Sequence, residues 1–252
     1  MKEITNKILD KKYFIFDVDG TLIDSMSMWN MVDQKILYDN FGIRVSQFDI
    51  KVFRDSVIYN EQNVHGDIYM AYNEAIIKYF NLGITAQEFH DIRRELSRDF
   101  SINQLDYKPG AAKFLNILKL LGKKIGVATT GVKSQYYIYT NLNKKMIKQA
   151  SLKNLVDASV HFEDVVRKKP DPEAYFKIME KLGAKPEECI VFEDSLNGVI
   201  AAKDAGLEVC SVYDESAANE QDVIDKIADY KVDSFDEFIN ILGLDKVQNQ
   251  PQ

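Results

Sequence analysis

A short apolar run near the start of the chain ends in two carboxylates. Residues 13–16 read Tyr-Phe-Ile-Phe, and Asp17, Asp19 and Gly20 follow them. A continuous aromatic and β-branched run predicts a strand that is buried on both faces of a parallel sheet. Gly20 would allow a tight turn that brings the two aspartates around one point, where their charges repel unless a cation or a shared proton relieves them. A hard metal such as Mg²⁺ prefers such oxygen ligands, whereas the structural alternative is an ordinary Asp/Gly turn after a strand.

The composition limits the classes of protein to which the chain can belong. Its 252 residues, 46% of them hydrophobic, can bury a full core as one large domain or two smaller ones. A net charge of -7 and a pI of about 5.1 argue against a general binder of nucleic acids or membrane surfaces. Residues 1–7 are too charged for a signal peptide, and no apolar run is long enough to span a bilayer. Cys189 and Cys210 lie in or beside strand-like runs and are expected to be buried free thiols, which fits a cytoplasmic protein.

From Lys108 onward, short strand-like runs alternate with helical patterns. The expected strands cover residues 124–129, 158–160, 189–192, 208–212 and 230–232, and the expected helices cover residues 111–121, 132–150, 171–182, 196–205 and 235–242. This alternation predicts an α/β fold with a doubly wound, Rossmann-like parallel sheet. Ligands in such sheets bind outside the carboxyl ends of the strands.

Residues 25–105 interrupt this pattern with helical periodicity alone. Apolar faces recur over residues 29–41 and 68–80, and Thr85 to Glu88 form a capping-box pattern that opens a third helix. We therefore expect an all-helical cap domain of residues 25–105, inserted into a core domain of residues 1–24 and 106–252.

Polar residues follow several of the expected strands at the point where each strand ends. Asp17 and Asp19 follow the first strand, Thr129 and Thr130 the second, Glu193 and Asp194 a later one, and Lys168 and Lys169 precede a helix. Carboxylates suit Mg²⁺, while hydroxyls, backbone amides and a lysine suit phosphate oxygens. Because no glycine-rich loop of the P-loop or dinucleotide type is present, the pattern predicts a phosphoryl-transfer site without a nucleotide cradle.

These motifs, taken in order, resemble the haloacid dehalogenase (HAD) superfamily over nearly the whole chain. The matching residues are Asp17-Val18-Asp19-Gly20-Thr21, Thr129, Lys169-Pro170 and Glu193-Asp194-Ser195. The surrounding stretches DVDGTLIDS (17–25), KPG (108–110), KPDPE (169–173) and FEDSLNGVIAAKDA (192–205) look like the phosphoglucomutase-like branch. That branch carries a helical cap directly after the first motif, which is the position of residues 25–105.

The resemblance implies a role for each matched residue. Asp17 would be the nucleophile that forms an aspartyl-phosphate, and Asp19 the general acid and then base, with a pKa raised by the charge of its neighbour. Thr129 and Lys169 would hold the phosphoryl oxygens. The metal ligands would be Asp17, the backbone carbonyl of Asp19, Asp194 and, directly or through water, Glu193.

Fewer residues are expected to contact the rest of the substrate. Thr130 and Gly131 stand where the family often has Ser or Asn, and they are the candidates in the core. Arg54 is the candidate in the cap, because its segment is similar to the arginine segment of sugar-phosphate mutases. His65, Arg93, Arg94 and Arg98 are better explained as solvated charges, and Trp29 and the tyrosines 136, 137 and 139 as packing.

The expected function is a Mg²⁺-dependent phosphatase that hydrolyses a small soluble phosphomonoester. The alternative is a hexose-phosphate mutase of the β-phosphoglucomutase type, which hands the phosphoryl group of its aspartyl-phosphate to a sugar. A non-enzymatic phospho-aspartate receiver is disfavoured, because Lys169 precedes the acidic pair Glu193-Asp194 and a receiver has no use for the insertion. The expected partner is a small phosphorylated metabolite, with no nucleic acid or membrane, and the expected state is a monomer or at most a weak homodimer.

Overall fold

The computed structural model describes residues 7–61, 68–245 and 247. The chain divides into two compact units, Met1–Ser25 with Leu105–Gln252, and Met26–Gln104. The borders expected from the sequence, 24/25 and 105/106, each differ from these by one residue. None of the helices in the described ranges has both the length and the apolar character that a membrane span requires.

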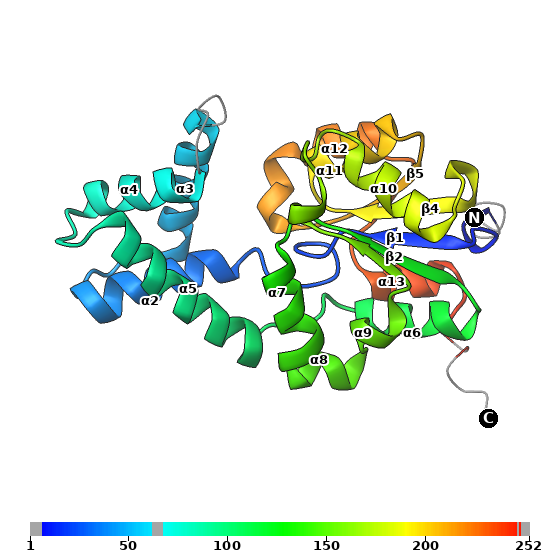
Figure 1. Ribbon diagram of the computed structural model, residues 1–252, viewed down its shortest axis with the longest axis horizontal. Coiled ribbons are helices and arrows are strands. Elements are labelled where there is room, and N and C mark those ends of the chain that lie inside the picture. Colours follow the sequence, from blue (N-terminus) through cyan, green and yellow to red (C-terminus); the bar gives the residue numbers. More distant parts are fainter. Residues whose placement is uncertain (1–6, 62–67, 246, 248–252) are drawn as a thin grey trace. The chain divides into compact units, whose positions relative to one another are not determined.

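The larger unit contains a six-stranded parallel sheet (Figure 1). Its strands are β1 (Tyr13–Phe16), β2 (Lys124–Ala128), β3 (Ala158–Val160), β4 (Cys189–Glu193), β5 (Glu208–Val212) and β6 (Tyr230–Val232). Their order is β3-β2-β1-β4-β5-β6, and every neighbouring pair is parallel. The doubly wound parallel sheet predicted from the sequence is therefore confirmed. The chain runs outward from β1 to one edge and later from β4 to the other, so the topology switches between β1 and β4, where ligands of such sheets bind.

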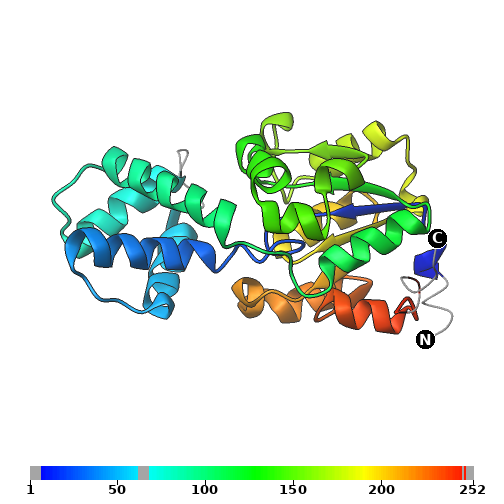
Figure 2. The same cartoon turned by 90° about the horizontal axis from the view of Figure 1, so that it is seen from below.

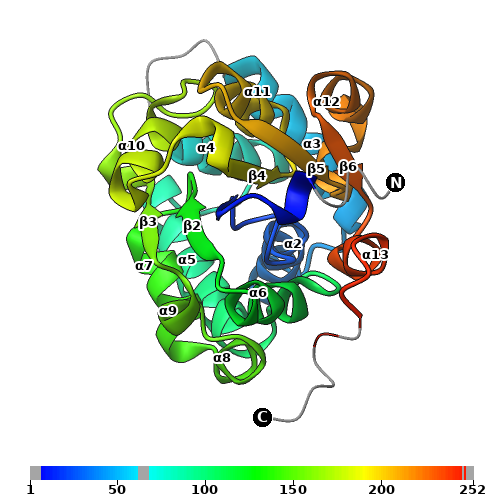
Figure 3. The ribbon, with the colours of Figure 1, turned by 90° about the vertical axis from the view of Figure 1, so that its right-hand side faces the viewer.

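Helices cover both faces of this sheet (Figure 3). On one face lie α10 (Glu173–Leu182), α11 (Leu196–Asp204) and α12 (Gln221–Ile227), and on the other lie α6 (Ala111–Leu120) and α13 (Phe235–Ile241). Side chains alternate along β1, so they pack against the helices on both faces of the sheet. Phe14 and Phe16 contact Phe114 of α6, whereas Ile15 belongs to the cluster that includes Tyr175 of α10. Three 3₁₀ helices, η2 (Phe162–Asp164), η3 (Pro186–Glu188) and η4 (Glu215–Glu220), lie in the connections.

An aromatic cluster fixes the α6 side of the sheet. Phe16 and Phe192, on neighbouring strands, stack with ring centroids 4.8 Å apart. Phe114 packs edge-on against Phe192 at 5.6 Å and stacks on Phe235 of α13 at 5.5 Å. All four rings are fully buried, so the cluster holds the ends of β1 and β4 against two helices by both burial and ring geometry.

The segment after β2 is not the single helix that was expected over residues 132–150. It consists of α7 (Lys133–Tyr137), a π-helical turn (Ile138–Leu142), α8 (Lys144–Gln149) and then α9 (Leu152–Leu155). Asn143 separates the π turn from α8, where its side chain accepts a hydrogen bond from the amide of Met146 and donates one to the carbonyl of Leu105. A buried asparagine is better satisfied as a helix cap than inside a helix, and so the prediction of one continuous helix was wrong.

Every regular element among the described residues of the smaller unit is a helix. The unit comprises α2 (Met28–Phe41), α3 (Gln47–Glu61), α4 (Ile68–Phe80) and α5 (Ala86–Asn103), and α2 and α5 run side by side (Figure 2). The capping box before α5 is confirmed, since the side chains of Thr85 and Glu88 each accept a hydrogen bond from the other residue's amide. The sequence did not single out α3.

A buried ion pair lies inside this smaller unit. The guanidinium of Arg93 donates to both carboxylate oxygens of Asp33, at 2.7 and 3.2 Å, and stacks over the rings of Trp29 and Tyr72. The hydroxyl of Tyr72 also donates to Asp33, at 2.8 Å. The expectation that Arg93 is a solvated charge was therefore wrong, whereas Arg94 and Arg98 are exposed. His65 lies outside the described residues.

The aromatic cluster gives a first prediction. Phe114→Ala should lower the free energy of unfolding by about 3–5 kcal/mol, because it leaves a cavity beside the three other rings of the cluster. Urea denaturation measures this change. Leu120→Ala, on the same helix but 59% exposed, is the matched control and should change the value by no more than about 0.5 kcal/mol. Similar losses in both variants would contradict the role given to the cluster.

Candidate active site

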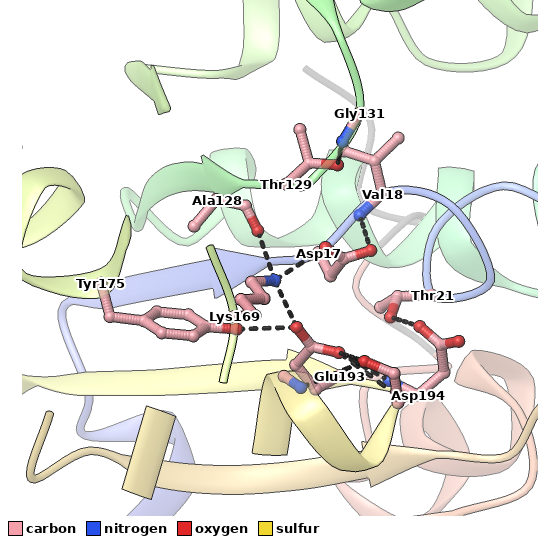
Figure 4. A network of polar contacts seen from close by, with 12 residues as sticks. Asp17, Val18, Thr21, Ala128, Thr129, Gly131, Lys169, Tyr175, Glu193 and Asp194 are labelled. Atoms are coloured by element: carbon pink, nitrogen blue, oxygen red, sulfur yellow. Dashed lines mark hydrogen bonds and ion pairs between the residues drawn. The ribbon is translucent and has the colours of Figure 1, made fainter. Parts of the chain in front are cut away.

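Three carboxylates meet at the topological switch point of the sheet (Figure 4). Asp17 follows β1, Glu193 ends β4, and Asp194 comes next. The amide of Asp17 donates to the carbonyl of Phe192 at 3.0 Å, so the ladder between β1 and β4 sets the position of the nearby side chains. All three side chains are buried, and each offers an oxygen within 4.8 Å of the others.

Lys169 is the cation that faces these carboxylates. Its ammonium donates to Oδ1 of Asp17 at 2.8 Å, to the carbonyl of Ala128 at 2.9 Å and to Oε1 of Glu193. Burial opposes the charge of Lys169, yet Asp17 and Glu193 together raise the pKa of its ammonium well above the ordinary value. Lys168, the other lysine of this loop, turns instead to the carbonyl of Val165, so only Lys169 reaches the site.

The turn after Asp17 is built against Asp194. Gly20 has a φ of +90°, and a Cβ at this position would lie 2.2 Å from Oδ2 of Asp194. The hydroxyl of Thr21 donates to Oδ1 of the same carboxylate at 2.6 Å. The sequence-based expectation of a glycine-dependent turn is confirmed, and the close approach adds a second reason why only glycine fits.

Asp19 lies beside this group and is held by two hydroxyls. Ser25 and Tyr139 both donate to its Oδ1, each at 2.7 Å. Burial raises the pKa of the Asp19 carboxyl, and the two hydroxyls oppose the rise. The expected direction of this pKa shift is confirmed, but its cause is burial rather than the charge of Asp17.

The loop after β2 supplies the remaining residues on this side. Thr129 is buried, and its Oγ1 accepts a hydrogen bond from the amide of Gly131 at 2.9 Å. A Cβ on Gly131 would lie 3.0 Å from Oδ2 of Asp19, so a larger residue at this position would crowd that oxygen. Thr130 is exposed. Arg54 is buried in α3 of the smaller unit, and its role toward a substrate stays a prediction, as do those of Thr130 and Gly131.

Sequence reasoning missed two tyrosines of this site. Tyr175 of α10 donates its hydroxyl to Oε1 of Glu193 at 2.8 Å, and Tyr139 donates to Asp19. Both side chains are buried. A tyrosine on the apolar face of a helix has the pattern of a core residue, so nothing in the sequence distinguishes these two from tyrosines that only pack. Tyr139 is buried, as expected of a packing residue, and its hydrogen bond to Asp19 is the part that the sequence did not predict.

The donor set fits a hard divalent cation. Three buried carboxylates face one ammonium, and burial together with the charges of Glu193 and Asp17 raises the pKa of Asp194 well above its ordinary range. A cation would relieve this excess of negative charge. Both oxygens of Glu193 already accept hydrogen bonds, one from Lys169 and Tyr175 and the other from Ser195 and the amide of Asp194. Asp17 accepts one hydrogen bond on each oxygen, from Lys169 and from the amide of Val18, and Asp194 accepts one from Thr21. These two carboxylates therefore keep more lone pairs for a cation than Glu193 does.

A parallel sheet that gathers buried carboxylates and a lysine at its switch point is the framework of an enzyme. The chain belongs to the haloacid dehalogenase-like hydrolase family, whose sequence model matches residues 11–206. The Bacillus subtilis protein YhcW is 29% identical over 239 residues, which cover 95% of this chain and 99% of that protein. Hexitol phosphatase B of Escherichia coli K12 is 26% identical over 230 residues, covering 88% and 92%. A solved Thermotoga maritima structure shares the fold, with a TM-score of 0.73 and 23% identity over 93% of this chain and 99% of that one.

Glu173 stabilises the loop that carries Lys169 by accepting hydrogen bonds from the loop backbone. Its carboxylate accepts hydrogen bonds from the amides of Val166 and Arg167, at 3.1 and 2.8 Å, and pairs with Lys177 at 2.6 Å. The Lys177 contact and these two amides lower the pKa of Glu173 from 4.5 to about 2. Because the carboxylate binds its proton more weakly in the folded chain, it stabilises the fold above pH 4.5, and this contribution disappears as the pH falls toward about 2.

Glu173→Gln should therefore lower the Tm at pH 7, because the amide keeps the shape of the side chain but loses its charge. The Tm difference from the unmodified protein should shrink between pH 4.5 and pH 3. Thermal unfolding followed by circular dichroism measures it. Glu180→Gln, exposed on the same helix, is the control and should leave the Tm unchanged. A Tm difference that does not depend on pH would rule out the charged contacts as its cause.

Proposed function

We propose that the protein is a Mg²⁺-dependent phosphatase that hydrolyses a small soluble phosphomonoester through an aspartyl-phosphate on Asp17. The observation that carries this proposal is the position of Asp17. Its carboxylate lies at the switch point, 2.8 Å from the ammonium of Lys169 and with an oxygen within 4.8 Å of one of Asp194, and the carboxyl group of Asp19 follows two residues later. Membership of a hydrolase family supports the same conclusion.

In the first half of the proposed reaction, an oxygen of Asp17 attacks phosphorus and the bond from phosphorus to the leaving oxygen breaks. Asp19 passes its proton to that oxygen, which leaves as an alcohol. Lys169, 2.8 Å from Oδ1 of Asp17, offsets negative charge on the nucleophile and on the phosphoryl oxygens that approach it. The buried hydroxyl of Thr129, next to Gly131, is a donor for a phosphoryl oxygen.

In the second half, water attacks the phosphorus of the aspartyl-phosphate. Asp19, now a carboxylate, takes a proton from that water, and the bond between phosphorus and Asp17 breaks. Inorganic phosphate leaves, and both aspartates return to their starting states. One carboxyl group therefore serves as acid and then as base, which requires that it stay in one position through both halves.

Mg²⁺ would be held by Asp17, Asp194 and the backbone carbonyl of Asp19. Glu193 would contribute indirectly, through water or through the residues that it holds. The ion, when bound, supplies positive charge beside the transferring phosphoryl group. Glu193 would act mainly by holding Lys169 and the backbone around Asp194, since its oxygens are already occupied by hydrogen bonds.

The name of one relative supports a substrate class. Hexitol phosphatase B is a full-length relative, so phosphorylated polyols and sugars are the first substrates to test. The same relative favours water over sugar as the acceptor, and the mutase alternative is therefore not favoured. The proposal includes a monomeric protein in the cytoplasm, and the two buried free cysteines support that location.

The test is a panel of phosphomonoesters assayed for phosphate release with Mg²⁺. Asp17→Asn should remove both turnover and covalent labelling by substrate, because no nucleophile remains. Asp19→Asn should slow turnover by about 10²–10⁴-fold but still allow labelling, since only the proton donor is missing. A phosphoenzyme in the Asp17→Asn variant would show that the nucleophile is another residue.

The metal is tested separately by binding. Asp194→Asn should lose both activity and the heat of Mg²⁺ binding in calorimetry, because it removes a charged ligand. Circular dichroism should show that the variant stays folded. Asp204→Asn, an exposed change on α11, is the control and should bind Mg²⁺ normally. Full turnover of the unmodified enzyme in excess chelator would contradict the metal requirement.

A further inference from the structure

Tyr139 contacts the carboxylate that the proposed mechanism uses as acid and base. Its hydroxyl donates to Oδ1 of Asp19 at 2.7 Å, across 120 residues of sequence. The side chain of Tyr139 is only 2% exposed, so the hydroxyl meets the carboxylate away from bulk water. A hydrogen bond to a charged group is stronger than one between neutral groups, and burial strengthens it further.

The π-helical turn gives Tyr139 surroundings unlike those of its neighbours. Tyr137, at the end of α7, is 56% exposed, and Tyr136 packs against the ring of His161 at 4.7 Å. Tyr139 lies in the π turn and faces Asp19 instead. Single π turns often occur at functional sites, because the extra residue redirects a side chain that a regular helix would point elsewhere.

A tyrosine that only packs can satisfy its hydroxyl in a simpler way. Tyr107, also buried in this unit, donates its hydroxyl to the backbone carbonyl of Ala150 at 2.6 Å. Tyr139 donates instead to a carboxylate of the active site, and Ser25 donates to the same oxygen at 2.7 Å. The other oxygen, Oδ2, faces Gly131, where an added Cβ would lie 3.0 Å away, so the missing side chain leaves space beside it. The two hydroxyls on Oδ1 therefore fix the orientation of the Asp19 carboxyl group.

We propose that Tyr139 is a positioning residue that, with Ser25, holds the Asp19 carboxyl group in the orientation needed for proton transfer. This inference rests on the proposed phosphatase function. Two hydroxyls occupy Oδ1, so the proton that Asp19 gives to the leaving oxygen, and later takes from water, is carried on Oδ2. The phosphorus–oxygen bonds form and break as described for the two halves of the reaction, and Tyr139 keeps its own proton throughout.

The test compares Tyr139→Phe with the unmodified enzyme over a series of phosphate monoesters that differ in leaving group. Alkyl phosphates need a proton on the leaving oxygen, whereas p-nitrophenyl phosphate does not. We expect kcat/KM to fall about 10- to 100-fold for an alkyl phosphate, the range for a lost hydrogen bond to a charged group. For p-nitrophenyl phosphate the fall should be less than about 3-fold, because proton donation contributes little there.

Matched variants separate positioning from packing. Tyr137→Phe removes the same hydroxyl two residues earlier, at an exposed site, and should leave both esters unaffected. Ser25→Ala removes the second donor to Oδ1 and should reproduce the dependence on leaving group. Thermal unfolding of Tyr139→Phe checks that the variant is folded. A loss that is equal for all leaving groups, or no loss at all, would overturn the positioning role of Tyr139.

The outcome also distinguishes this inference from the function on which it rests. If the unmodified enzyme releases no phosphate from any ester, the proposed function fails. If it releases phosphate and Asp17→Asn does not, while Tyr139→Phe behaves like Tyr137→Phe, the function stands and the inference about Tyr139 fails.

Discussion

The buried charges around Lys169 are the constraint on which the rest of the structure depends. A charge in the interior is costly unless an opposite charge and hydrogen bonds accompany it. Lys169 meets this condition with Asp17, Glu193 and the carbonyl of Ala128, and Tyr175 completes the hydrogen bonds of Glu193. The sheet positions these groups by adjacency, since β1, β2 and β4 are neighbours and the loop before α10 brings in the lysine. The aromatic cluster on the α6 side of the sheet then holds the ends of β1 and β4 in place.

Much of the larger unit could be predicted because its strands carry a direct signal. Residues 13–16 and the run that starts at Cys189 are continuous apolar segments, and a strand buried on both faces needs such a composition. Asp17, Lys169, Glu193 and Asp194 could be gathered in advance, because the carboxyl ends of parallel strands share one edge. Tyr139 and Tyr175 could not be, since their partners lie 120 and 18 residues away and no local pattern records which buried tyrosine meets a carboxylate.

In the smaller unit, too, a contact between residues that are distant in sequence could not be predicted from a local pattern. A charged residue in an amphipathic helix is solvated in most proteins, so the sequence predicts an exposed Arg93. Its burial depends on Asp33, Trp29 and Tyr72, which lie on two other helices and are invisible to any analysis of α5 alone. The break at Asn143 has a similar origin, because a carbonyl at Leu105 completes its hydrogen bonds. Which buried polar groups bind one another is decided only in the folded chain, whereas hydrophobic periodicity can be recognised within a single segment.

Because Tyr139 lies in a π turn, the number of residues between β2 and Asn143 determines which side chain faces Asp19. Successive residues of an α-helix are rotated by about 100° about its axis, and a π turn adds one residue to this count. A relative whose chain is one residue shorter between β2 and Asn143 would present a different side chain to the carboxylate, although every active-site motif remained intact. On the role proposed for Tyr139, two enzymes with identical motifs but different segment lengths would differ in how well they expel a poor leaving group.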